Sequence, residues 1–172
     1  MDARDLLIDG IGQLNEWLDE ALEPMTAEQL NWLPEGKTTS AGFNAWHVVR
    51  TQDNIVNFVF QKKTPIWLEK GYMEKMGLPK VDQGTGMTLE DARAVKIADP
   101  ALLREYNKEV GAACLEFVRN VPLEDLNEVQ MIKPLGEMSK AKVLRQVVMT
   151  HGFMHLGEIN HIKGTMGLQF SI

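Results

Sequence analysis

Hydrophobic and polar residues of this chain follow a helical period over four long stretches. In residues 3–22 apolar side chains recur every three or four positions with acidic residues between them, which predicts an amphipathic helix. A second stripe of apolar residues predicts a helix over residues 41–63, with Ser40 or Thr39 as its N-cap. The sequence therefore begins with two long helices that each have one face suited to a core.

The second half of the chain contains two more helical patterns. Asp99 and Pro100 mark a helix start, because aspartate caps a helix and proline is tolerated at the first helical position. The helix that follows is expected to run to about residue 121. A last helix is expected over residues 140–167, with Ser139 as its N-cap.

The segments between the helices lack a sustained period. Residues 64–88 are rich in glycine, proline and methionine, and we expect a long ordered connection there with one short helix. Residues 122–139 are a connector in which "EVQMI" is expected to be extended. These patterns predict one all-α domain over residues 1–172, an antiparallel four-helix bundle with a long connection between its second and third helices.

Composition and charge narrow the classes of function. The chain is 44% hydrophobic and 24% charged, close to the average for globular proteins. Its net charge of -6 provides no electrostatic attraction to nucleic acid phosphates or to an anionic membrane. No stretch approaches the roughly 18 apolar residues of a membrane span. We therefore expect neither nucleic acid nor a membrane as a partner.

The single cysteine, Cys114, excludes an intrachain disulfide and a thiolate cluster. Its apolar neighbours in "VGAACLEF" are typical of a buried core residue rather than of a nucleophile. A metal site must therefore be built from histidine and carboxylate side chains. The charged residues of "MDARDLLIDG" are unlike a secretory signal, so we expect a cytoplasmic protein.

Histidines provide the clearest candidate chemistry. His151 and His155 are four residues apart, so on a helix their side chains lie one turn apart on the same face. His161 lies six residues beyond His155, which turns it away from that face. His47 belongs to the second predicted helix. Because bundles form sites between facing helices, we expect His47, His151 and His155 to converge at one end of the bundle.

Three neutral imidazoles can hold a divalent transition metal and leave coordination positions open for water or substrate. Zinc, nickel and iron are the candidates, since imidazole suits all three. The spacing of His151 and His155 also arises by chance in unrelated helices. In the alternative interpretation these two are boundary histidines satisfied by polar neighbours, and His47 is a buried core histidine.

Glu158 shares the helix face of His151 and His155. Three roles are open to it: a fourth metal ligand, an acceptor for an imidazole N–H, or a catalytic proton acceptor for a metal-bound water or thiol. The alternative is a solvated helix carboxylate. Asp53 lies six residues after His47 and is turned away from it by about 120°, so it ranks below Glu158 as a candidate.

Three segments resemble the DinB-like superfamily, the metal-binding four-helix bundles that include thiol-dependent S-transferases and maleylpyruvate isomerases. "SAGFNAWHVVRTQDNIVNF" is similar to the second helix of that family, and "HGFMHLGEINHIKG" to its closing helix. "IWLEKGYMEKMGLPKVDQGTGMT" resembles the connector of one branch. Glu158 stands where the family commonly has glutamine, and His161 has no fixed counterpart.

The resemblance implies that His47, His151 and His155 are the metal-binding triad. It also implies a low-molecular-weight thiol as cosubstrate, because the metal lowers the thiol pKa in the enzymes of the family. A homodimer is implied as well. The connector has apolar residues that we expect to be exposed in a contact patch of the dimer: Ile66, Trp67, Tyr72 and Met73.

Functions from different classes follow from these observations. The first is an enzyme in which the metal activates a thiol or water, either a thiol S-transferase or a hydrolase, with a small thiol or another small molecule as substrate. The second is a non-catalytic metal-binding stress-response protein, which a closed site with Glu158 as the fourth ligand would favour. A purely structural homodimer without metal is the third.

Overall fold

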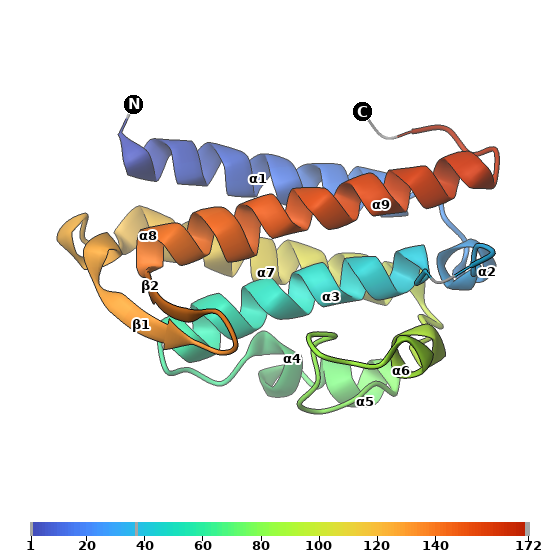
Figure 1. Ribbon diagram of the computed structural model, residues 1–172, viewed down its shortest axis with the longest axis horizontal. Helices are drawn as coiled ribbons and strands as arrows, with labels where there is room; N and C mark the ends of the chain where they lie inside the picture. The colour runs from blue at the N-terminus through green and yellow to red at the C-terminus, as the bar shows by residue number, and fades with distance from the viewer. Residues whose placement is uncertain (1, 37, 171–172) are drawn as a thin grey trace.

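The computed structural model describes residues 2–36 and 38–170, and four long helical rods dominate it (Figure 1). Two of the rods contain a π-helical stretch, in which the backbone turns are wider than in an α-helix. The rods are α1 (Ala3–Leu22), α3 (Ala41–Asp53) continued by π-helical η1 (Asn54–Phe60), α7 (Pro100–Asn120), and α8 (Lys140–Val143) continued by π-helical η3 (Leu144–Thr150) and α9 (His151–Thr165). The expected all-α bundle is confirmed.

The helices begin at the capping residues that the sequence indicates. The Ser40 hydroxyl accepts a hydrogen bond from the Phe43 N–H, and the Ser139 hydroxyl accepts one from the Lys142 N–H. The Asp99 carboxylate accepts hydrogen bonds from the first N–H groups of α7. Each cap satisfies a backbone donor that the helix itself leaves free. The boundary at Asp99 also separates α7 from a short preceding helix, α6 (Leu89–Ala94).

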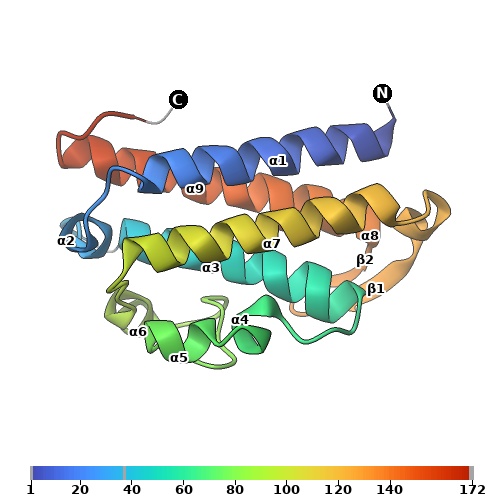
Figure 2. The same cartoon turned by 180° about the vertical axis from the view of Figure 1, so that it is seen from behind.

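The long connection determines the directions of the four rods. It carries the chain back along the bundle, so that Ile97 lies beside Asn31 and α7 starts near the start of α3 (Figure 1). As a result α3 and α7 run parallel, whereas α1 and α7 run antiparallel, as do α3 and α9. Figure 2, the view from behind, shows α7 in front, between α1 and α3. The bundle is therefore antiparallel only between some of its neighbouring helices.

The connection itself contains two short helices before α6, where the sequence predicted one. These are α4 (Ile66–Glu69) and α5 (Tyr72–Met76). Trp67 and Tyr72 are fully buried against the bundle, because their rings pack on Tyr106 of α7. The expectation of an exposed contact patch is wrong for Trp67 and Tyr72, whereas Ile66 and Met73 are partly buried.

A buried carboxylate fixes the start of the connection. The Asp53 side chain has no exposed surface and accepts hydrogen bonds from the backbone N–H groups of Ile66 and Trp67. The Tyr106 hydroxyl donates to the same carboxylate at 2.7 Å. Burial and the Asp53 charge raise the pKa of Tyr106 well above its usual range, so this hydroxyl keeps its proton. Asp53 therefore holds the connection to α3 and α7.

A β-hairpin follows α7 and the short 3₁₀ helix η2 (Glu124–Asn127). Strand β1 (Val129–Ile132) pairs antiparallel with β2 (Gly136–Ser139), with Val129 opposite Ser139. The extended segment expected at "EVQMI" is confirmed, and its partner strand is an addition that the sequence analysis did not predict.

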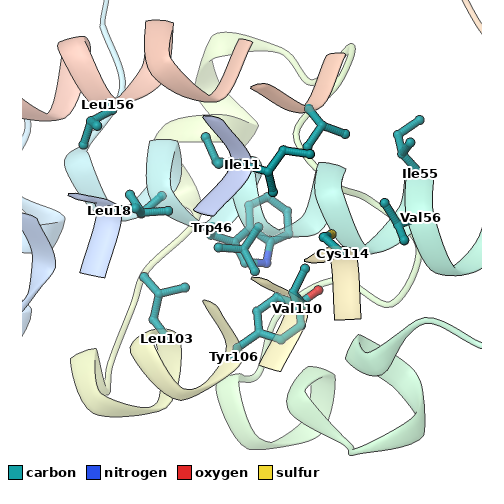
Figure 3. Close-up of a cluster of buried hydrophobic side chains, with 14 of the residues drawn as sticks. Ile11, Leu18, Trp46, Ile55, Val56, Leu103, Tyr106, Val110, Cys114 and Leu156 are labelled. Carbon is teal, nitrogen blue, oxygen red and sulfur yellow. The ribbon is translucent and has the colours of Figure 1, made fainter. Parts of the chain in front are cut away.

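The core is a cluster of buried side chains contributed by all four rods (Figure 3). Trp46 of α3 lies near its centre, among residues of α1, α7 and α9. Cys114 of α7 is fully buried in this cluster, and burial raises the pKa of its thiol. Cys114 is therefore a core residue, as its neighbours in the sequence indicated. Within the described ranges, no helix is both long and apolar enough to cross a membrane.

Candidate metal centre

Three histidines meet between α3 and α9. The Nε2 atom of His151 lies 3.1 Å from Nε2 of His47 and 3.0 Å from Nε2 of His155. These three residues are the group of possible metal ligands found among the described residues. The predicted convergence is confirmed, but its predicted place is not. His47 lies well inside α3 and His151 near the middle of the last rod, so the cluster lies along the seam of the two helices and not at an end.

Two of the imidazoles are oriented by acceptors on their far side. Nδ1 of His47 faces the backbone carbonyl of Gln83, and Nδ1 of His155 lies 2.7 Å from a Glu158 carboxylate oxygen. A carbonyl and a carboxylate accept hydrogen bonds, so both Nδ1 atoms carry the proton. In the neutral form of each ring the lone pair is then on Nε2, the atom that His47 and His155 both turn toward His151.

The surroundings of His151 and His47 favour the neutral imidazole, the form that binds a metal. Burial, and after it the neighbouring His155 and His47, lower the pKa of His151 to about 4. Burial also lowers the pKa of His47, against the hydrogen bond with Gln83, which raises it. Both rings are therefore neutral at pH 7, which is the state that binds a metal.

The donor set fits a divalent transition metal. Three neutral imidazoles form the protein ligand set of open zinc sites, with metal–nitrogen bonds of about 2.0–2.1 Å. Bonds of that length at tetrahedral angles place the nitrogens about 3.3 Å apart, close to the separations of 3.0 and 3.1 Å found here. Closely spaced lone pairs repel one another without a cation between them, so this arrangement favours a metal site over the alternative of boundary and core histidines satisfied by polar neighbours.

Comparison with known proteins agrees with this architecture. The model of the DinB superfamily matches residues 13–159. The chain belongs to the DinB superfamily. A solved structure with the same fold is the conserved protein of locus from Enterococcus faecalis, at a TM-score of 0.85 and 22% identity over 97% of this chain and 99% of that one. No curated protein matches.

Within this DinB fold, Glu158 occupies one of the three roles considered for it. Its carboxylate contacts Nδ1 of His155, so the imidazole ring stands between Glu158 and the point where the Nε2 atoms meet. The hydrogen bond with His155 lowers the pKa of Glu158, which stays ionised at neutral pH. In this arrangement Glu158 accepts a hydrogen bond from His155 and orients that ring. His161 is exposed and lies outside the cluster, as expected.

The connector supplies two residues that the sequence analysis missed. Gln83 presents its backbone carbonyl to His47, and Gly84 packs against the same ring. Phe43 stacks on His47 with an interplanar angle of 13°. The Gly-x-Gly step at residues 84–86 was the available signal, since a glycine in a connector marks close approach of the backbone. A side chain at residue 84 would occupy the space of the His47 ring.

Gly84→Ala is expected to weaken metal binding by about tenfold or more. Replacing a residue that supports a metal ligand usually lowers metal affinity by that much. The Gly84 φ of +97° is unfavourable for alanine, and a Cβ would lie 2.5 Å from Nδ1 of His47. Gly86→Ala is the matched control, because Gly86 has a φ of +79° but open space around it. Metal titration by calorimetry compares the two, and equal affinities would contradict the role of Gly84.

A groove opens beside the cluster. It has a volume of about 700 Å³ and extends from His151 between the two π-helical segments, η1 and η3, to the β-hairpin. This volume is in the range of small-molecule sites. π-Helical turns are frequent at functional sites, and here both of them contribute side chains to the same groove.

Proposed function

We propose that this protein is a metal-dependent enzyme that activates a thiol or water for attack on a small-molecule substrate. The observation that carries the proposal is the meeting of three Nε2 atoms, from His47, His151 and His155, beside a groove that His151 lines. Zinc, nickel or iron(II) fits this ligand set. A divalent ion held there acts as a Lewis acid and lowers the pKa of a coordinated thiol or water.

Residues around the three histidines orient the imidazole rings for metal binding. Gln83 and Glu158 fix the tautomers of His47 and His155, so that the lone pairs of these two ligands are directed at the cluster before the metal binds. The ionised Glu158 also holds the His155 ring in its orientation through this hydrogen bond. Apolar side chains of the adjacent groove exclude water from one side of the site, which strengthens electrostatic interactions there.

The openness of the site supports an enzyme over a non-catalytic metal-binding stress-response protein. Structural zinc sites are closed by four protein ligands, whereas catalytic sites keep a position for water or substrate. Among the described residues, three histidines form the cluster and Glu158 is turned to the outer edge of His155. A thiol S-transferase is favoured over a hydrolase only by the resemblance to the DinB-like enzymes.

Turnover assays test the proposal. Untagged protein is first analysed for its metal content, then stripped with a chelator and reloaded with zinc, nickel or iron(II). Each form is assayed with small thiols plus electrophiles, and separately with esters and amides. We expect turnover that is lost on stripping and restored by one metal. Metal binding without turnover on any of these substrates would favour the non-catalytic alternative.

Glu158→Ala is expected to weaken metal affinity or to lower turnover by about 10- to 100-fold, as is usual for an acceptor behind a metal-binding histidine. Glu158→Gln keeps an oxygen that accepts the hydrogen bond from His155 and should lose less metal affinity. Competition with a metal-binding dye gives both affinities. If the alanine variant binds metal and turns over substrate like the unaltered protein, Glu158 is only a solvated helix residue.

The proposal also includes a homodimer in the cytoplasm. The dimer rests on the resemblance to the DinB-like enzymes, because Trp67 and Tyr72 of the patch first expected to mediate it are buried. Sedimentation at micromolar concentration tests it, and a monomer alone would contradict it.

A further inference from the structure

We propose that the groove beside His151 binds the apolar, uncharged body of the substrate and that Thr51 recognises a neutral hydrogen-bonding group on it. This inference rests on the proposed function for the reaction itself. The binding of such a molecule, however, depends only on the groove. It can therefore be measured separately from metal binding and turnover.

The walls of the groove are mainly apolar. Ile55 and Phe58 of η1 line one side, and Val147 of η3 lines the other. The hairpin adds Met131 and Leu135 at the outer edge. Exposed apolar surface of this kind is unfavourable in water, and a ligand that covers it gains about 25 cal/mol for each Å² removed from water. The walls therefore favour an aromatic or branched aliphatic group.

The charges around the groove restrict the substrate further. Lys133, on the exposed turn of the hairpin, is the one charged side chain among the described residues that line the groove, and no carboxylate lines it. A cationic ligand would lose its hydration without gaining an ion pair. A phosphorylated ligand would lack the cluster of arginines or backbone N–H groups that such ligands use. An uncharged ligand meets neither obstacle.

Thr51 provides the polar contact. It lies one helical turn after His47 and lines the groove, and only 4% of its surface is exposed. Its hydroxyl is buried and has no hydrogen-bond partner within the described part of the chain. An unpaired buried hydroxyl is unfavourable, and rotation about the Cα–Cβ bond would let it meet a ligand in the groove. A hydroxyl or carbonyl group of the substrate would supply the missing partner next to the metal-facing histidines.

Three matched probes test the chemistry of the groove: 1-naphthalenemethanol, 1-ethylnaphthalene and 1-naphthylmethylammonium. They share one aromatic body and differ in a neutral hydroxyl, a methyl group and a positive charge. Their affinities for the purified protein are measured by NMR titration. We expect the alcohol to bind at least about tenfold more tightly than the ammonium ion. Equal binding of the two, or no binding of the alcohol, would overturn the proposal.

Thr51→Val removes the hydroxyl but keeps the branched shape of the side chain, so it tests the contribution of the hydroxyl to binding. The variant should lose about three- to tenfold in affinity for the alcohol and nothing for 1-ethylnaphthalene. A loss of affinity for both probes, or for neither, would overturn the role of Thr51. Valine has the same branched shape as threonine, so we expect α3 to be undisturbed.

A substitution at the edge of the groove locates the binding site. Leu135→Lys should weaken binding of the alcohol by about threefold or more. Leu6→Lys on α1 is the control, because Leu6 is 56% exposed and Leu135 is 52% exposed. Equal effects of the two variants would contradict binding in this groove. If the probes bind as expected but no metal-dependent turnover is found, the proposed function fails while the inference about the groove stands.

Discussion

His151→Ala and His155→Ala are each expected to abolish metal binding at micromolar concentrations of the ion. The site has three imidazole ligands among the described residues, and each variant leaves only two. Loss of a residue that merely supports a ligand already weakens metal sites by about 10- to 100-fold, so loss of a ligand itself should exceed that range. Turnover should be lost together with the metal.

The fold should survive these two substitutions. Both histidines lie half-buried on the seam of α3 and α9, outside the cluster of buried side chains that forms the core. Elemental analysis and circular dichroism of each variant measure metal content and helix content. His161→Ala is the control, because His161 is exposed on the same helix and contacts neither ligand. Full metal retention in either ligand variant would show that the triad is not the metal site.

Asp53→Asn is expected to lower the free energy of unfolding by about 3–5 kcal/mol, the usual effect of breaking a buried ion pair. Arg50 is 3% exposed, and its guanidinium lies 3.8 Å from the Asp53 carboxylate and over the ring of Trp67. The substitution leaves this cation buried without its counter-charge. It also replaces an oxygen that accepts from the Trp67 N–H and the Tyr106 hydroxyl.

Urea unfolding measures this effect. Asp82→Asn is the control for loss of a negative charge, because Asp82 is exposed in the connection. Adding Arg50→Met to Asp53→Asn should restore about 1 kcal/mol or more, since the unpaired buried cation is then removed. A loss below about 1 kcal/mol in the single variant would show that the Asp53 contacts do not hold the connection.

Local patterns in the sequence were sufficient to predict the four long helices. Amphipathic periodicity and capping residues act within a few positions of the chain, so Ser40, Asp99 and Ser139 could be identified as helix starts without the fold. The same holds for two of the three candidate ligands. His151 and His155 share a face because of helix geometry alone. The exclusion of His161 follows from the same geometry.

Contacts between distant segments decided the rest. The sequence does not show that the connection runs back along the bundle, because its direction depends on the burial of Trp67 and Tyr72 and on the hydrogen bonds of Asp53. That route is also what brings the Gln83 carbonyl to His47. A backbone carbonyl is present at every residue, so no residue type in the sequence marks the one that orients a ligand.

The role of Glu158 could not be predicted from the sequence either, although it lies on the same helix as His151 and His155. Its spacing places it on the histidine face, and three roles were consistent with that spacing. Only the tertiary structure shows how the His155 ring is oriented, with Nδ1 toward Glu158 and Nε2 toward His151. The sequence by itself thus determined the helices and the pair of histidines on α9. The tertiary structure decided how close His47 comes to that pair, where the groove forms, and which groups orient the imidazole rings. These features depend on packing between segments far apart in the chain.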